Sequence, residues 1–178
     1  MEKDDILERL VFSEGVVEAY SRPERECAEA AGDHWSGPVL LERVAYLRKL
    51  AHFSEGTASD TIREFGGYSL LLRVLVRSSE AMVDERHALT FVVLEGRATM
   101  VSGGTLKNSR ATAGDEVRGT AIVDGANREL QRGDVVHLAA GTPYQFFLSG
   151  EKSFGCIVAR VKEDFEPARS STPAPSGL

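Results

Sequence analysis

The chain has little of what marks several common classes of protein. Two cysteines, Cys27 and Cys156, occur in 178 residues, and they lie too far apart for a zinc spacing or a disulfide framework. No apolar run approaches the roughly 20 residues that a membrane-spanning helix needs. Lys and Arg number 21 against 27 Asp and Glu, so the formal charge is −6 and no basic excess would attract nucleic acid. We expect a soluble protein with neither a nucleic-acid nor a membrane partner. Its acidic first ten residues do not resemble a secretory signal, so we expect it in the cytoplasm.

The hydrophobic periodicity changes near Gly66. Before this residue, apolar side chains at helical spacing predict a helix from about Ser36 to Gly56: Leu40, Leu41, Val44, Leu47 and Leu50. After it come short segments rich in β-branched and aromatic residues, most of them closed by Gly: 68–76, 90–96, 97–104, 118–125, 128–134, 135–141, 142–150 and 153–161. This pattern predicts a mainly β fold, a small barrel or sandwich preceded by a helical segment.

We expect four parts along the chain. Residues 1–35 form a helical and linker extension, residues 36–65 a helix and connection that pack on the barrel, and residues 66–162 the barrel. Residues 163–178, dominated by Pro, Ser and Thr, form a disordered tail. Within the segment 68–76, alternation places five apolar side chains on one face and Arg73 and Arg77 on the opposite face.

Two glycine-punctuated stretches carry the most specific signal: FVVLEGRATMV at 91–101 and GDVVHLAAGTPYQ at 133–145. Both predict tight reversals between antiparallel strands, at which Gly supplies a positive φ. On these motifs the chain resembles a single-domain bacterial cupin over roughly residues 66–162, and residues 36–53 resemble a leading helix. The resemblance implies a small double-stranded β-barrel, or jelly roll, that is often a homodimer.

The resemblance also implies where such a barrel would hold a metal, and the sequence departs from that pattern. The usual Glu position is Leu89, the usual His region reads Val83-Asp84-Glu85, and the His position of the second motif is Tyr144. Leucine has no lone pair to donate, and a neutral phenol is a poor ligand for a divalent ion. We therefore predict a degenerate site with no metal and no cofactor.

Several side chains are candidates for binding a small-molecule ligand, and none is assigned a catalytic role. Tyr144 would either donate from its hydroxyl to a bound anion or carbonyl, or simply plug the barrel. His137 would either face the lumen or be a hydrogen-bonded core residue. His87 would either pair with Asp84 or Glu85, or lie in a solvated loop. The other candidates for the same space are Gln145, Arg118, Glu116 and Tyr68.

Three functions are compatible with these residues. The first is a metal-free cupin that binds a small molecule. The second is a metal-dependent cupin enzyme, of isomerase, dioxygenase or decarboxylase type, with a rearranged site built from Asp84, His87 and His137. The third is a structural or regulatory protein that oligomerises, because the apolar face of residues 40–50 needs a covering surface.

Overall fold

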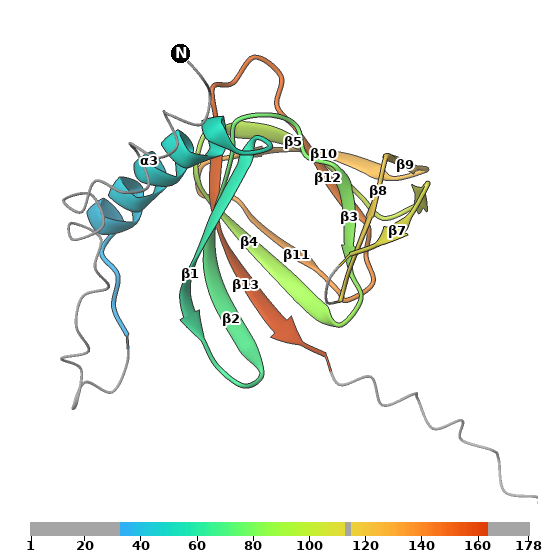
Figure 1. Ribbon diagram of the computed structural model, residues 1–178, viewed down its shortest axis with the longest axis horizontal. Coiled ribbons are helices and arrows are strands. Elements are labelled where there is room, and N and C mark those ends of the chain that lie inside the picture. Colours follow the sequence, from blue (N-terminus) through green and yellow to red (C-terminus); the bar gives the residue numbers. More distant parts are fainter. Residues whose placement is uncertain (1–32, 113–114, 164–178) are drawn as a thin grey trace, which may run out of the picture. The chain divides into compact units, whose positions relative to one another are not determined.

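The computed structural model describes residues 33–112 and 115–163 (Figure 1). The chain divides into two compact units, Met1–Ser36 and Gly37–Leu178. Because the described residues begin at 33 and end at 163, almost all of the predicted extension 1–35 and of the predicted tail 163–178 lies outside them. Among the described residues, no helix is both long and apolar enough to cross a membrane.

The predicted helix is confirmed as α3, Gly37–Phe53. Pro38 suits its first turn, and Gly56 follows its end with a φ of +90°. Its buried face consists of Leu40, Val44, Leu47 and Ala51, and it packs against the first two strands of the fold. The apolar face of residues 40–50 is thus covered largely by the chain's own sheet.

Two antiparallel sheets form the body of the fold, which confirms the predicted β architecture. One sheet has the strand order β1-β2-β13-β4-β11, the other the order β10-β5-β12-β3-β8-β7, and β6 and β9 pair separately. The bounds are β1 (Thr57–Glu64), β2 (Tyr68–Leu75), β3 (Ala81–Asp84), β4 (His87–Glu95), β5 (Arg97–Ser102), β6 (Thr105–Lys107), β7 (Arg110–Ala111), β8 (Glu116–Gly119), β9 (Ala121–Val123), β10 (Ala126–Gln131), β11 (Val135–Leu138), β12 (Tyr144–Phe147) and β13 (Phe154–Lys162).

The core lies between the two sheets and combines aliphatic side chains with a group of packed aromatic rings. The ring centroids of Phe91 and Phe146 are 5.4 Å apart, and those of Phe146 and Phe154 are 5.2 Å apart. Met100 fills space beside them and is fully buried. The turn between β4 and β5 depends on Gly96, which has a φ of +76°, because a Cβ there would lie 2.1 Å from the carbonyl oxygen of Ser153.

The sheets begin earlier and use more of the chain than the sequence pattern predicts. β1 precedes the expected barrel boundary at residue 66, and β3, β6 and β7 lie outside the predicted segments. β2 alternates as predicted, with Arg73 on the face opposite Leu72 and Val74, but the face that carries Arg73 is the inner one. Leu72 and Val74 lie outside the core cluster between the sheets, on the side where α3 packs, whereas Arg73 lies between the core residues Leu71 and Leu75. Both faces of β2 are buried, so apolarity alone does not distinguish them.

Candidate functional site

Polar side chains from six strands gather on the inner faces of the two sheets. Asp84 lies opposite Glu116, and Met82 lies opposite both Arg118 and Tyr144. Opposed residues of antiparallel strands project from the same face, and Tyr144 belongs to the core cluster, so these residues share the inner face. The polar cluster, as we call it, is Arg73, Asp84, His87, Glu116, Arg118, Tyr144 and Arg160.

Arg73 reaches from β2 in one sheet to β12 in the other. Its Nη1 donates a hydrogen bond to the hydroxyl oxygen of Tyr144 (3.1 Å) and lies 3.9 Å from the sulfur of Met82. Arg73 is half-buried. No carboxylate of the described residues forms an ion pair with it. Because a guanidinium stays protonated in proteins, Arg73 places a positive charge inside the barrel without an anionic contact.

The groups next to Arg73 are neutral near pH 7. Burial raises the pKa of the Tyr144 phenol above its usual value, and the charge and hydrogen bond of Arg73 oppose this effect without overcoming it. Burial also raises the pKa of the Cys156 thiol, which lies opposite Arg73 on β13, to about 12. Neither the phenol nor the thiol therefore supplies a negative charge to compensate the guanidinium.

Asp84 contrasts with Arg73, because every acceptor position of its carboxylate is used. Its Oδ1 accepts hydrogen bonds from the backbone nitrogens of Arg86 (3.3 Å) and His87 (3.0 Å) and from His87 Nδ1 (2.8 Å). Its Oδ2 accepts from Nε (2.8 Å) and Nη2 (2.7 Å) of Arg160. The Asp84 side chain is 2% exposed, so this buried carboxylate links β3, β4 and β13.

Glu116, directly opposite Asp84, is poorly satisfied. Its one ion pair among the described residues is with Arg118, at 3.9 Å, and no hydrogen bond to its carboxylate is found in that part of the chain. Arg118 lies closer to Glu80 (3.5 Å), which also accepts hydrogen bonds from Arg110 at 2.9 Å on both oxygens. The Glu116 side chain is 28% exposed, so its oxygens keep acceptor capacity.

The structure brings five of the predicted candidates into the polar cluster: Tyr144, Asp84, His87, Arg118 and Glu116. Of the alternatives open for His87, the structure shows a contact of its Nδ1 with Asp84 Oδ1. The other three candidates lie elsewhere. His137 is exposed and bonds through Nδ1 to Thr90 (3.0 Å), so it is neither in the lumen nor a core residue. It lies on β11 between the core residues Val136 and Leu138, whose side chains take the inner face.

Gln145 and Tyr68 are likewise placed away from the polar cluster. Gln145 alternates with the core residues Tyr144 and Phe146 and donates to the backbone oxygen of Ser79 (2.9 Å), which is a structural role. Tyr68 is 41% exposed and stacks on Phe65, at 4.3 Å between ring centroids, near the turn between β1 and β2. The expectation that both side chains line the lumen is therefore wrong.

Two members of the polar cluster, Arg73 and Arg160, were missed at the sequence level. Each stands alone among apolar residues, in SLLLRVLV and GCIVARV. An isolated arginine in a strand whose neighbours are apolar on both sides is the signal that would have indicated them, because such a strand is buried on both faces. The ordinary interpretation, in which arginine marks the solvent face, fails at Arg73.

The residues at the positions implied by the cupin resemblance do not fit a metal ion. Leu89 is buried and has no donor atom, the oxygens of Asp84 are occupied by Arg160 and His87, and Tyr144 is hydrogen-bonded by a guanidinium. Within residues 33–112 and 115–163, no group of three or more His, Cys, Asp or Glu side chains could hold an ion. A protein cation, Arg73, stands beside the position of the implied His ligand.

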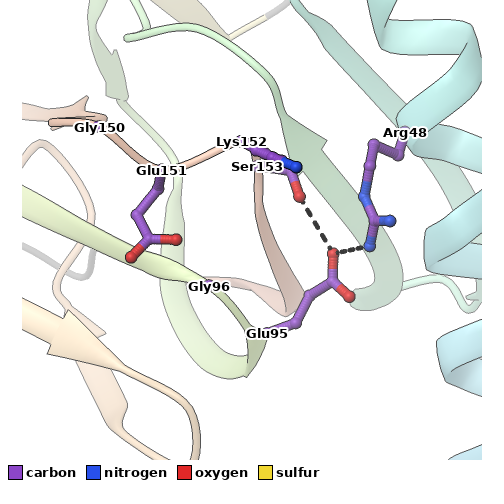
Figure 2. Close-up of a pocket in the computed structure, with 7 residues that line it drawn as sticks. All are labelled: Arg48, Glu95, Gly96, Gly150, Glu151, Lys152 and Ser153. Atoms are coloured by element: carbon purple, nitrogen blue, oxygen red, sulfur yellow. Dashed lines mark hydrogen bonds and ion pairs between the residues drawn. The ribbon is translucent and has the colours of Figure 1, made fainter.

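A surface cleft of about 420 Å³ lies at the opposite end of β4 and β13 (Figure 2). It is lined by Arg48 of α3, by Glu95 and Gly96, and by residues 150–153. Arg48 and the Ser153 hydroxyl both bind Glu95 Oε1, the hydroxyl at 3.3 Å. These three side chains, which we call the α3 clamp, tie the helix to the barrel. The Glu95 carboxylate already binds Arg48 and Ser153, so we assign this cleft a structural role, the attachment of α3 to the barrel.

Comparisons with known proteins show likeness in the fold. No protein-family model matches the chain, and no curated protein matches it. The chain is similar to the solved structure of TT1209 from Thermus thermophilus, at 15% identity and a TM-score of 0.49, over 68% of this chain and 93% of that one. It is also similar to the Cnp3 cupin domain of Schizosaccharomyces pombe, at 9% identity and a TM-score of 0.45, over 60% of this chain and 61% of that one.

A third similar structure is the DMSP lyase DddQ from Ruegeria pomeroyi DSS-3, at 16% identity and a TM-score of 0.46. The alignment covers 66% of this chain and 52% of that one, so the chain spans about half the length of that protein. At such identities the likeness concerns the fold alone. The double-stranded, cupin-like β-barrel predicted from the two motifs is confirmed by the order and pairing of the strands themselves.

Proposed function

We propose that this chain is a metal-independent barrel that binds a small molecule through an anionic group, most simply a carboxylate. The single observation that carries the proposal is the half-buried guanidinium of Arg73, whose contacts are a phenol and a thioether. A charge held partly out of water costs free energy unless a counter-charge or hydrogen bonds compensate it. A ligand carboxylate would supply both, since its geometry matches the guanidinium fork.

Tyr144 supports the same ligand class. Its hydroxyl oxygen accepts from Arg73, and its own hydrogen has no acceptor among the described contacts, so it remains available to a ligand. The raised pKa of the phenol, caused mainly by burial, keeps that hydrogen in place near neutral pH. The polar cluster is in contact with solvent at Arg160 and His87, whose side chains are 27% and 19% exposed, whereas Tyr144 itself is buried.

Neither of the other two hypotheses has a specific observation in its favour. The rearranged metal site needs His137 beside Asp84 and His87, but His137 lies on the outer face of its sheet. An oligomerising role for the helix needs a free apolar face. Leu40, Val44 and Leu47 of the predicted face are buried within the unit, and Leu50 is the one member of it that is exposed (41%). The homodimer and the cytoplasmic location stay predictions.

The test uses Arg73→Met, which keeps most of the side-chain volume and removes the charge. Propionate and butyrate serve as probes, with 1-butanol as the uncharged match, and binding is measured by calorimetric titration. We expect the carboxylates to bind the natural protein better than the alcohol, and Arg73→Met to weaken carboxylate binding at least tenfold, about 1.4 kcal/mol.

Arg128→Met is the matched control, because Arg128 is exposed on β10, and it should leave binding unchanged. Circular dichroism and melting curves establish that both variants are folded. Equal carboxylate affinity in the natural protein and in folded Arg73→Met would refute the proposal, and so would the absence of any carboxylate binding.

A further inference from the structure

The polar cluster holds a second group with unused capacity, and it carries the opposite charge. We infer that the ligand is amphoteric: its carboxylate binds Arg73 and Tyr144, and a positively charged amino group at its other end binds Glu116. This inference rests on the proposed function, because it adds a second contact to the same ligand. The chemical class it specifies is a small amino acid or ω-amino acid.

Of the two carboxylates in the polar cluster, Asp84 and Glu116, only Glu116 is available to bind an ammonium group. Asp84 and Glu116 lie opposite each other on β3 and β8. Asp84 accepts five contacts from backbone and side-chain donors, so no lone pair remains for a ligand. Glu116 has a single ion pair at 3.9 Å, longer than a hydrogen bond, and solvent reaches it. It is the carboxylate of the pair that can accept hydrogen bonds from an ammonium group.

Glu116 is close enough to Arg73 and Tyr144 to act on both electrostatically. The pKa values of Arg73 and Tyr144 both lie above their usual ranges. Burial has the largest effect on each, acting downward on Arg73 and upward on Tyr144, and the charge of Glu116 acts upward on both. Yet no ion pair joins Glu116 to Arg73 in the described residues. Glu116 and Arg73 thus carry opposite charges that act on each other without an ion pair between them, which is the arrangement that an amphoteric ligand would complete.

Arg118 does not compete strongly for Glu116. Its shorter contact is with Glu80, at 3.5 Å, and its side chain is 36% exposed. An exposed, long ion pair of this kind contributes little free energy, so its partner remains available. Glu116 is thus held near the lumen by its backbone position on β8, where its own carbonyl oxygen accepts from the Thr112 hydroxyl (2.8 Å).

The test compares three matched pairs of probes by calorimetric titration: glycine against acetate, β-alanine against propionate, and γ-aminobutyrate against butyrate. Each pair differs only in the terminal ammonium group, and the series varies the distance between the two charges. We expect one amino acid of the series to bind at least tenfold better than its matched alkanoate, as a hydrogen bond between charged groups would give.

Glu116→Gln should reduce that preference to less than threefold without weakening alkanoate binding, because it removes a negative charge that acts on Arg73. Glu151→Gln is the control, because Glu151 is exposed at the opposite end of the barrel, and it should keep the full preference. If no amino acid is preferred, or if the preference survives in Glu116→Gln, the inference is wrong. Arg73→Met distinguishes failure of this inference from failure of the proposed function. If carboxylate binding depends on Arg73 but no ammonium group is preferred, the proposed function stands and only the inference about Glu116 is wrong.

Discussion

The barrel has an arginine–carboxylate group at each end of β4 and β13, and the two groups differ in burial. Arg160, Asp84 and His87 lie where β4 begins and β13 ends, and the Asp84 side chain is 2% exposed. The α3 clamp lies where β4 ends and β13 begins, with Glu95 24% and Arg48 36% exposed. In the first group the Asp84 carboxylate is enclosed by protein, whereas both charged members of the second group are in contact with water, so loss of a partner has different consequences at the two ends.

The difference shows what a buried ion pair does in this fold. Asp84 joins three strands through five donors, and a buried charge that loses its partner is left without solvation. Glu95 joins a helix to the sheet, and water can replace either of its partners. Burial, more than the number of contacts, therefore decides how much the barrel depends on each group.

The largest effect is expected at the buried end. Asp84→Asn keeps the shape but removes the charge that compensates Arg160, so the free energy of unfolding should fall by about 3 kcal/mol. Urea denaturation with the natural protein as reference measures this difference. A loss below about 1 kcal/mol would mean that the two ends do not differ as burial implies.

The next largest effect concerns the positive charge of Arg73 and its influence on metal affinity. Leu89→Glu with Tyr144→His restores two donors at the positions that the cupin resemblance implies for a metal, but Arg73 remains beside them. We expect Arg73→Ala, added to this pair, to raise the affinity for Co²⁺ or Ni²⁺ at least tenfold, because a like charge is removed from the site.

The absorption spectrum of bound Co²⁺ and the metal-induced rise in melting temperature provide the two measurements. The double and triple variants are compared at equal concentration after circular dichroism shows that both are folded. Equal metal affinity with and without Arg73, or stoichiometric metal bound tightly by the natural protein, would contradict the role of Arg73 as the resident cation.

The smallest effect is expected at the α3 clamp. Glu95→Gln keeps a hydrogen-bond acceptor for Arg48 and Ser153, and the site is partly in water, so the loss should be about 0.5 kcal/mol. The same urea denaturation measures it, and added salt, at about 0.5 M NaCl, should reduce the difference further. If Glu95→Gln lowered the free energy of unfolding as much as Asp84→Asn does, burial would not distinguish the two ends of the barrel.

Local chemistry was sufficient to predict the class of fold. The helical spacing before Gly56, the short β-rich segments and the glycine turns are short-range features, and Gly96, Gly133 and Gly141 all have positive φ. The placement of Tyr144 on the inner face is what the cupin resemblance of its motif implies, and Tyr144 does belong to the core cluster. The pairing of Asp84 with His87 spans three residues and was within reach of the same reasoning.

The binding partners inside the barrel depend on contacts between distant parts of the chain. Arg160 meets Asp84 across 76 residues and Arg73 meets Tyr144 across 71, and no local pattern encodes such pairs. A strand's alternation defines two faces without saying which is inner, and the packing of α3 on one side of β2 decided that choice for Arg73. The same reason explains His137: its apolar neighbours took the inner face and left the imidazole outside.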